Sequence, residues 1–284
     1  MKHGTKRKIK SGILKGLVYF CAAFTVSILV ALLGYIFVRG IPNITWQLLS
    51  TKPSAIRDTI GILPNILNTL YIILLTLLIA LPLGVGAAVY LTEYAKNKTF
   101  ARIVEFTTET LAGIPSIIYG LVGMLFFVKV LKFGTSLLSG SLTLVIMILP
   151  TIIRTTQESL KTVPASYREG ALGLGATKWH MIRTIVLPSS ISGIVTGCIL
   201  SVGRIVGESA ALLFTAGSAT IIADGLISAY TKGGGTLSVA LYIYASERAE
   251  FDVAFAIAAI LLIMVFILNL LAKLAAKKLN RGKE

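Results

Sequence analysis

Residues 169–188 read EGALGLGATKWHMIRTIVLP and form a polar stretch between two long apolar runs of the chain. Four basic side chains lie within it or directly before it: Arg168, Lys178, His180 and Arg183. Charged side chains are costly inside a membrane, so they place this stretch in water. It is therefore predicted to be an aqueous loop that joins two membrane segments.

Two short helices are predicted within this loop. Pro164 suits the first turn of a helix, because its missing N–H would have no partner there. That helix should run to about Leu174, since Gly175 best tolerates the left-handed position that follows a helix. Thr177 can cap a second helix, which should end at Pro188.

The spacing of the loop resembles the EAA loop of ABC importer permeases. That family shows EAA, three residues, G, nine residues and I-x-L-P, and the matching positions here are Glu169, Ala171, Gly175, Ile185, Leu187 and Pro188. Gly170 is the one departure, in place of the first alanine. The resemblance implies a helix-turn-helix that docks in a groove on a cytoplasmic ATPase and transmits its closure to the membrane helices. An ordinary cytoplasmic loop is the alternative.

Small residues in the first of these helices favour docking. Gly170, Ala171 and Gly173 lie within it, and each glycine costs about 1 kcal/mol of helix propensity. Such residues on a short exposed helix are explained if another protein's surface approaches the backbone closely.

Composition indicates a membrane protein. The chain has 284 residues, of which 55% are hydrophobic and 14% charged, and its mean hydropathy is +0.85. Soluble domains carry about 25% charged residues. The two cysteines, Cys21 and Cys198, both lie in apolar runs and say little about redox compartment.

Six apolar segments approach or exceed the roughly 17–25 residues that a spanning helix needs. They cover residues 17–38, 63–90, 110–130, 137–153, 191–216 and 253–274. The predicted fold class is an all-α integral membrane protein with about six transmembrane helices. Three parts are expected: residues 1–62 with a basic tail, the first helix and an outer loop; a permease core at 63–276 containing the cytoplasmic loop 158–188; and a basic cytoplasmic tail at 277–284.

The net charge of +15 is distributed unevenly. With the N-terminal tail placed in the cytoplasm, 19 of the 27 Lys and Arg residues fall on the inner side and 7 on the outer side. This follows the positive-inside rule, so both termini and the EAA loop are expected inside. The excess charge then faces anionic headgroups, which argues against nucleic acid as the partner.

Two outer loops are expected, at 39–62 and 217–250. Trp46 in the first is placed to anchor at the membrane interface. The second contains three consecutive glycines at 233–235, and no phosphate-loop pattern occurs anywhere in the chain. The glycines are interpreted as a flexible linker, and the rest of that loop as a docking surface for a partner.

The third apolar segment contains LAGIPSIIYG at residues 111–120. Pro115 removes a backbone hydrogen bond and Gly113 allows close helix contact, so a kink is predicted around Gly113, Pro115 and Ser116. A kinked packing helix and a pore-lining helix fit this pattern equally well.

Arg204 and Glu208 are charged residues inside the fifth segment, with Arg204 about 20 Å from its start. A mid-membrane arginine costs about 3 kcal/mol on insertion scales and cannot deprotonate. One interpretation is an i,i+4 ion pair that fixes helix packing. The other, which is favoured, is a guanidinium that lines a wet path and binds an anionic substrate.

The strings RIVGESA (204–210) and LLFTA (212–216), together with LAGIPSIIYG, resemble the A-type phosphate-specific permease of ABC importers. Ala211 departs from that family, which has proline there. The resemblance implies the type I importer fold and a phosphate pathway at Arg204, Glu208 and Ser209. It also implies a homologous second permease, an ABC ATPase dimer and an extracytoplasmic phosphate-binding protein, in a bacterial cytoplasmic membrane. ATP and Mg would bind the ATPase, so this chain is expected to be no enzyme and to hold no cofactor or metal.

Three alternatives differ from this function. A permease for phosphonate, molybdate or sulfate would share the EAA loop. An intramembrane enzyme would need a nucleophile beside a histidine, or paired carboxylates, at membrane depth. The only histidines, His3 and His180, are expected in the cytoplasm. A self-sufficient ion-coupled carrier would need no such loop.

Overall fold

Helices dominate the computed structural model, which describes residues 2–54, 59–95, 97–222 and 225–281. The long helices are α1 (Lys2–Gly40), α3 (Leu63–Val89), α6 (Leu137–Thr162), α10 (Ile191–Gly207) and α14 (Phe251–Arg281). The shorter ones are α2 (Trp46–Ser50), α4 (Lys98–Ala112), α5 (Ser116–Gly123), α7 (Ala165–Gly173), α8 (Lys178–Met181), α9 (Leu187–Ser189), α11 (Ala210–Thr215), α12 (Leu226–Thr231) and α13 (Leu237–Tyr242). Five further helical turns are η1 (Ile41–Asn43), η2 (Tyr90–Tyr94), η3 (Met124–Val130), η4 (Ile182–Val186) and η5 (Ile243–Glu247).

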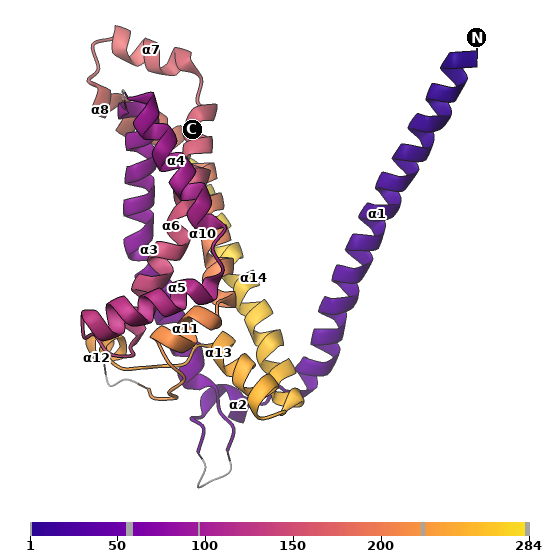
Figure 1. Cartoon of the computed structure of the whole chain (residues 1–284), viewed down its shortest axis with the longest axis vertical. Coiled ribbons are helices and arrows are strands. Elements are labelled where there is room, and N and C mark those ends of the chain that lie inside the picture. Colours follow the sequence, from indigo (N-terminus) through magenta and orange to yellow (C-terminus); the bar gives the residue numbers. More distant parts are fainter. Residues whose placement is uncertain (1, 55–58, 96, 223–224, 282–284) are drawn as a thin grey trace.

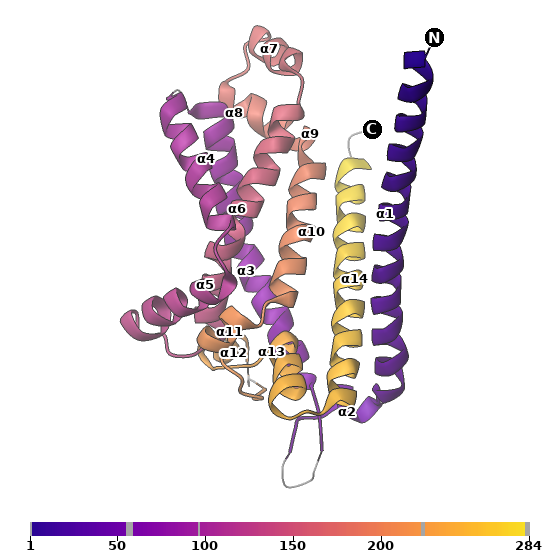
Figure 2. The ribbon, with the colours of Figure 1, turned by 45° about the vertical axis from the view of Figure 1, so that its right-hand side comes forward.

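The centre of the molecule is a bundle of α3, α6 and α10, with α14 packed along α10 (Figure 1). α7 lies at one end of this bundle, and α12 and α13 lie at the other (Figure 2). α1 meets α14 near its own C-terminal end, where the Tyr35 and Phe255 rings are 5.3 Å apart. From there α1 diverges from the rest of the molecule, and its most apolar part is not buried at all.

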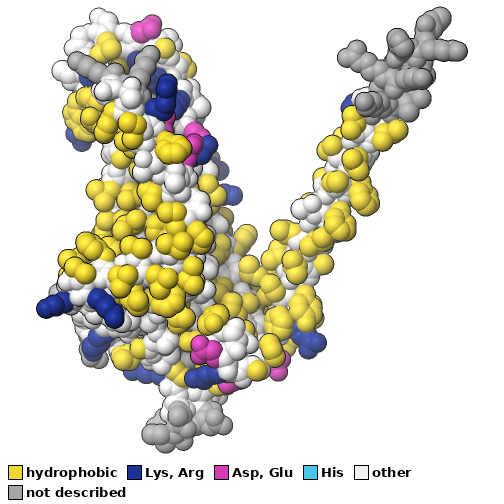
Figure 3. Space-filling view, in the orientation of Figure 1, with side chains coloured by type: hydrophobic (Ala, Val, Ile, Leu, Met, Phe, Trp, Pro, Cys, Tyr) yellow, Lys and Arg dark blue, Asp and Glu magenta, His cyan; other side chains and the backbone are white. Residues whose placement is uncertain are grey.

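Among the described residues, the number of helices that could span a membrane agrees with the predicted six. Four helical spans are long and apolar enough to cross a membrane, and two bent helix pairs raise the number to six. Figure 3 shows hydrophobic side chains across the middle of one face, with charged side chains gathered toward both ends. The all-α, multi-pass fold class is therefore confirmed.

The third segment bends where the kink was predicted, but its predicted start at residue 110 is wrong. α4 begins well before it, at Lys98, where the Asn97 side chain accepts two backbone N–H bonds and caps the helix. At Pro115 the chain turns by 99° into α5 and η3, which project sideways from the bundle (Figure 2). Proline cannot supply the N–H that would continue α4, so the kink becomes a break.

The interpretation of residues 233–235 as a flexible linker is also wrong. Gly234 and Gly235 are buried, and the side-chain amides of Asn65 and Asn68 donate to the Gly235 carbonyl at 2.9 and 3.2 Å. A Cβ at Gly234 would lie 2.5 Å from the Asn68 amide nitrogen. The glycines therefore let the chain pack tightly against α3, and the predicted outer loop folds into α12, α13 and η5.

Candidate transport pathway and coupling loop

The polar loop forms the two predicted short helices. Gly175 follows α7 with φ +83°, in the left-handed region. The N–H of Ala176 donates to the Ala171 carbonyl at 3.1 Å, a bond that characteristically closes a helix of this kind. Thr177 caps α8 by accepting the N–H of His180 at 3.3 Å. The second helix continues through η4 and α9 to Ser189, just past its predicted end, and then bends by 63° into α10.

The loop presents an exposed surface on its α7 and α8 side. Leu174 is 92% exposed, and Tyr167, Leu172 and Trp179 are also exposed. Glu169, Gly170 and Gly175 belong to the same exposed set. Apolar side chains this exposed at a polar end of the molecule mark an interaction surface.

The opposite side of the loop is buried in a small core of its own. We call this core the inner cluster, and its members are Ala88, Val89, Leu160, Val163, Ala171, Met181, Ile182 and Val186. Ile185 and Leu187 pack against it, and Pro188 is half-buried. Ala171 is thus small because it packs inward, so only Gly170 and Gly173 leave the backbone of α7 open to a partner.

The predicted fifth span is broken at the pair of charged residues. α10 ends at Gly207, Glu208 has extended backbone angles, and α11 starts at Ala210. No carboxylate of the described residues lies within ion-pair distance of Arg204, so the i,i+4 pair, which was the less favoured interpretation, is absent. That pairing needed a continuous helix, which the chain does not form here.

Each of the two charges lies at a helix end that suits it. Arg204 is in the last turn of α10, where the helix dipole favours a cation. Glu208 is 8% exposed, and its carboxylate accepts the N–H of Ala211 at 3.0 Å, in the first turn of α11. A proline at this position, as in the resembled family, has no N–H and could not donate that bond. Ser209 occupies the N-cap position of α11 and is half-buried.

One face of α10 is left uncovered by the rest of the chain. It carries the small or polar residues Ser192, Thr196, Gly203 and Gly207 together with Leu200. No atom lies within 4 Å of a Cβ built at Gly203 or Gly207. Arg204 directly follows Gly203 in α10 and is half-buried.

The break between α4 and α5 lies against α11. Gly113 caps the end of α4, Pro115 precedes α5, and Ser116 is its first residue. α5 packs so closely on α11 that a Cβ at Gly120 would lie 2.7 Å from the Ala211 Cα. The two interrupted segments predicted as sites, around Pro115 and around Glu208, are therefore brought together by this contact.

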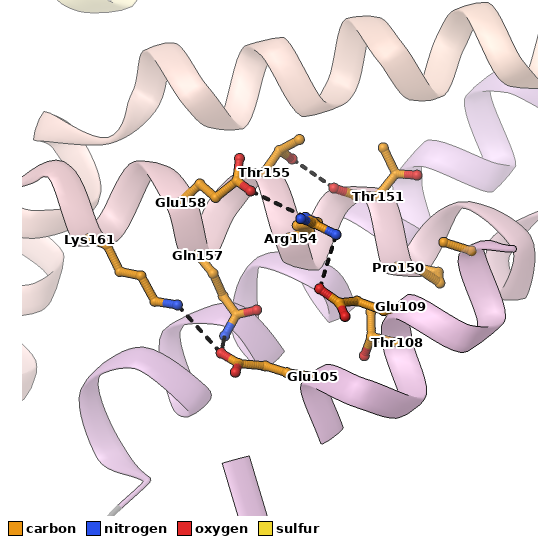
Figure 4. Close-up of a pocket in the computed structure, with 11 residues that line it drawn as sticks. Glu105, Thr108, Glu109, Pro150, Thr151, Arg154, Thr155, Gln157, Glu158 and Lys161 are labelled. Atoms are coloured by element: carbon orange, nitrogen blue, oxygen red, sulfur yellow. Dashed lines mark hydrogen bonds and ion pairs between the residues drawn. The ribbon is translucent and has the colours of Figure 1, made fainter. Parts of the chain in front are cut away.

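A charged cleft between α4 and α6 was not predicted. Its volume is about 370 Å³. Arg154 lies 3.1 Å from Glu109 and 3.2 Å from Glu158, while Lys161 and Gln157 point toward Glu105 (Figure 4). The ion-paired side chains are 43–64% exposed, which limits their contribution to stability. Among the described residues, no group of three or more His, Cys, Asp and Glu could hold a metal ion.

Comparison with known proteins gives one family and several close relatives. Residues 80–283 match the family described as binding-protein-dependent transport system inner membrane component. The probable ABC transporter permease protein YqgI of Bacillus subtilis is 40% identical, over 75% of this chain and 73% of its own. The phosphate transport system permease protein PstA of Haemophilus influenzae is 33% identical, over 94% of each chain. That of Pasteurella multocida is 30% identical, over 94% of this chain and 95% of its own.

Solved structures match over most of the chain. One is the crystal structure of a bacterial ABC transporter involved in the import of the acidic polysaccharide alginate, with a TM-score of 0.64 over 92% of this chain and 95% of that one. An inward-facing MetNI methionine ABC transporter gives a TM-score of 0.54 over 78% of this chain and 94% of that one. Their sequence identities of 16% and 20% show a shared fold alone.

Proposed function

This chain belongs to the family of binding-protein-dependent transport system inner membrane components, and we propose that it moves inorganic phosphate. The observation that carries the substrate is the similarity to PstA proteins over nearly the whole chain. The relatives and structural neighbours are permease subunits, so this chain is a permease and not the subunit that hydrolyses ATP.

Physical chemistry supports a phosphate pathway along the open face of α10. Phosphate is an anion, and the Arg204 guanidinium is a permanent cation with planar donors that match oxyanion geometry. The open space at Gly203 and Gly207 gives a ligand room beside it. Glu208 is buried and bonded to α11, so we assign it the role of holding the break that positions Arg204. The face is uncovered in this chain, and a second, homologous permease would complete the pathway.

The proposed partner proteins are inferred from the same family and from the exposed surfaces of this chain. ABC importers combine permeases with ATPase subunits, and the exposed surface of α7 and α8 is the docking site that we propose for an ATPase dimer. An extracytoplasmic phosphate-binding protein would deliver substrate at the opposite end. One of the solved neighbours is a complex of an alginate ABC transporter with a periplasmic protein bound to an alginate pentasaccharide.

The substrate is tested by uptake in cells that lack other phosphate importers and express this chain with its neighbouring transport genes. We expect ATP-dependent uptake of labelled phosphate that unlabelled phosphate suppresses and that excess sulfate, molybdate or phosphonate leaves unchanged. If one of those other oxyanions suppresses uptake and phosphate does not, that oxyanion is the substrate instead of phosphate. Uptake that persists without the ATPase would favour an ion-coupled carrier.

The orientation of this chain in the membrane is tested by single-cysteine labelling in intact cells, after Cys21 and Cys198 are replaced by alanine. Ser166 and Ser218 are both exposed. Ser166 is in α7 and Ser218 follows α11, and these two helices lie toward opposite ends of the molecule (Figure 1). Because the basic residues gather on the α7 side, we expect a membrane-impermeant thiol reagent to modify Ser218→Cys and to spare Ser166→Cys. Ser166→Cys should react once the cells are permeabilised. If only Ser166→Cys is labelled in intact cells, the chain has the opposite orientation in the membrane to the one expected here.

A further inference from the structure

An ion pair joins the coupling loop, residues 158–188, to the inner end of α3. The Nε and Nη2 atoms of Arg168, in α7, lie 3.1 and 2.8 Å from the Glu93 Oε1 atom, in η2. The two side chains are 21% and 7% exposed. Both are far more buried than the partners in the three other ion pairs of the described residues, whose side chains are at least 43% exposed.

The same guanidinium also bonds to the end of α6. Its Nη1 donates to the Val163 carbonyl at 2.6 Å and its Nη2 to the Leu160 carbonyl at 2.8 Å. Arg168 therefore holds α3, α6 and α7 together through one rigid, planar group. A lysine at this position could keep the charge but not this set of directions.

α8 is attached to the same turn of the chain. The Lys178 ammonium donates to the Glu93 backbone carbonyl, and its nitrogen lies 5.0 Å from the centre of the Tyr94 ring. Beneath these polar contacts, the inner cluster combines Ala88 and Val89 of α3 with residues from both halves of the loop. The inner end of α3 is thus packed and bonded to the coupling loop, although 65 or more residues separate them in sequence.

We propose that Glu93 and Arg168 are positioning residues that make the coupling loop and the inner end of α3 move as one body during transport. The chain itself connects the loop only to α6 and α10, so the ion pair adds α3 as a third helix that receives the motion of the ATPase. α3 carries Pro82 in its interior, a position at which a helix bends. The proposal rests on the docking role proposed above for the loop.

The test compares transport with ATP hydrolysis in the reconstituted complex. Glu93→Gln keeps the shape of the side chain but removes its negative charge. Arg168→Lys keeps the positive charge but removes the planar set of guanidinium donors. We expect both to assemble with the ATPase and hydrolyse ATP, while the phosphate moved per ATP falls roughly tenfold, as for the loss of a typical coupling interaction. Glu105→Gln, which makes the same substitution but removes an exposed ion pair with Lys161 at the same end, is the matched control and should keep the wild-type ratio.

A ratio of phosphate to ATP that stays at the wild-type value in Glu93→Gln would overturn the proposal. So would a fall in uptake that only follows protein abundance, because that result assigns the pair a structural role. Retention of the ATPase by purified Gly175→Arg, by contrast, would count against docking on the loop and not against the contact between Glu93 and Arg168. The two proposals therefore fail in different measurements.

A cross-link provides a second, independent readout. In a background without native cysteines, Glu93→Cys/Arg168→Cys removes the ion pair and should transport poorly. A short bifunctional thiol reagent then ties the two elements covalently, and uptake should recover toward wild type if they move together. If the cross-link instead stops the remaining uptake, the loop and α3 must separate during transport, and the proposal is wrong.

Discussion

Phosphate uptake is expected to fall by about 100-fold or more when Arg204 is replaced by glutamine, because the proposed pathway then loses the positive charge that would pair with the anionic substrate. Glutamine keeps much of the length and some hydrogen bonding but removes the charge. Membrane insertion and assembly with the ATPase should be unchanged, since no carboxylate of the described residues pairs with Arg204. The measurement is labelled uptake, normalised to the amount of assembled complex.

Two further variants distinguish a substrate contact from a structural one. Arg204→Lys keeps the charge and loses the planar fork, so it should transport at an intermediate rate. Glu208→Gln should still accept the Ala211 N–H through its amide oxygen, so its stability should change by only about 1 kcal/mol.

The double variant Arg204→Gln/Glu208→Gln decides between the two interpretations of the charges. If they formed a buried pair, removing both would restore stability and transport, since no unpaired charge would remain. The geometry instead predicts that the double variant is as stable as Arg204→Gln and equally inactive in uptake. If the double variant transports phosphate at the wild-type rate, Arg204 is not part of the substrate pathway.

The coupling loop was predictable because short-range rules govern it. Pro164, Gly175 and Thr177 each act on the backbone within a few residues, through a fixed φ, a left-handed position and a side-chain cap. Gly175 and Thr177 appear in the structure where the sequence places them. Pro164 lies one position earlier than predicted, at the N-cap of α7 and not in its first turn. The end of the second helix is also misplaced, because Pro188 is accommodated in the first turn of α9 and does not terminate it.

The course of the fifth segment was not predictable by the same rules. Apolar residues surround Glu208, and the helix-breaking proline of the resembled family is replaced by Ala211, so a continuous helix was the local expectation. The break is stabilised by the Glu208 carboxylate and by the Ser238 hydroxyl, which donates to the Glu208 carbonyl at 2.7 Å. Ser238 is 30 residues away in the chain, and sequence periodicity carries no information about such a contact.

Long-range contacts also explain one feature that was interpreted wrongly from the sequence and one that was not predicted. The glycines at 233–235 and the asparagines of α3 meet across some 170 residues. Glu93 and Arg168 meet across 75. Each partner alone has an ordinary explanation, as a linker or as a charge in a solvated loop. Their significance follows only from the packing that brings them together.

Gly175→Arg is expected to abolish ATPase-coupled uptake and to remove the ATPase from the purified complex. The structure separates two possible causes of this loss, backbone strain and added bulk. The φ of +83° costs a side chain about 1–2 kcal/mol, and apart from Gly175 and its two chain neighbours no atom of this chain lies within 4 Å of the new Cβ. The arginine would therefore meet no obstacle within the permease, and its bulk would project toward whatever docks on the loop.

Gly175→Ala is the matched control, because it carries the same backbone strain without the bulk. It should insert normally, retain the ATPase and keep most of its uptake. Gly170→Ala, which restores the alanine of the resembled family at an open position, should also retain both and gain about 1 kcal/mol of helix propensity. If Gly175→Arg keeps the ATPase bound and transports as Gly175→Ala does, no partner surface approaches this turn, and the ATPase must dock elsewhere on the permease.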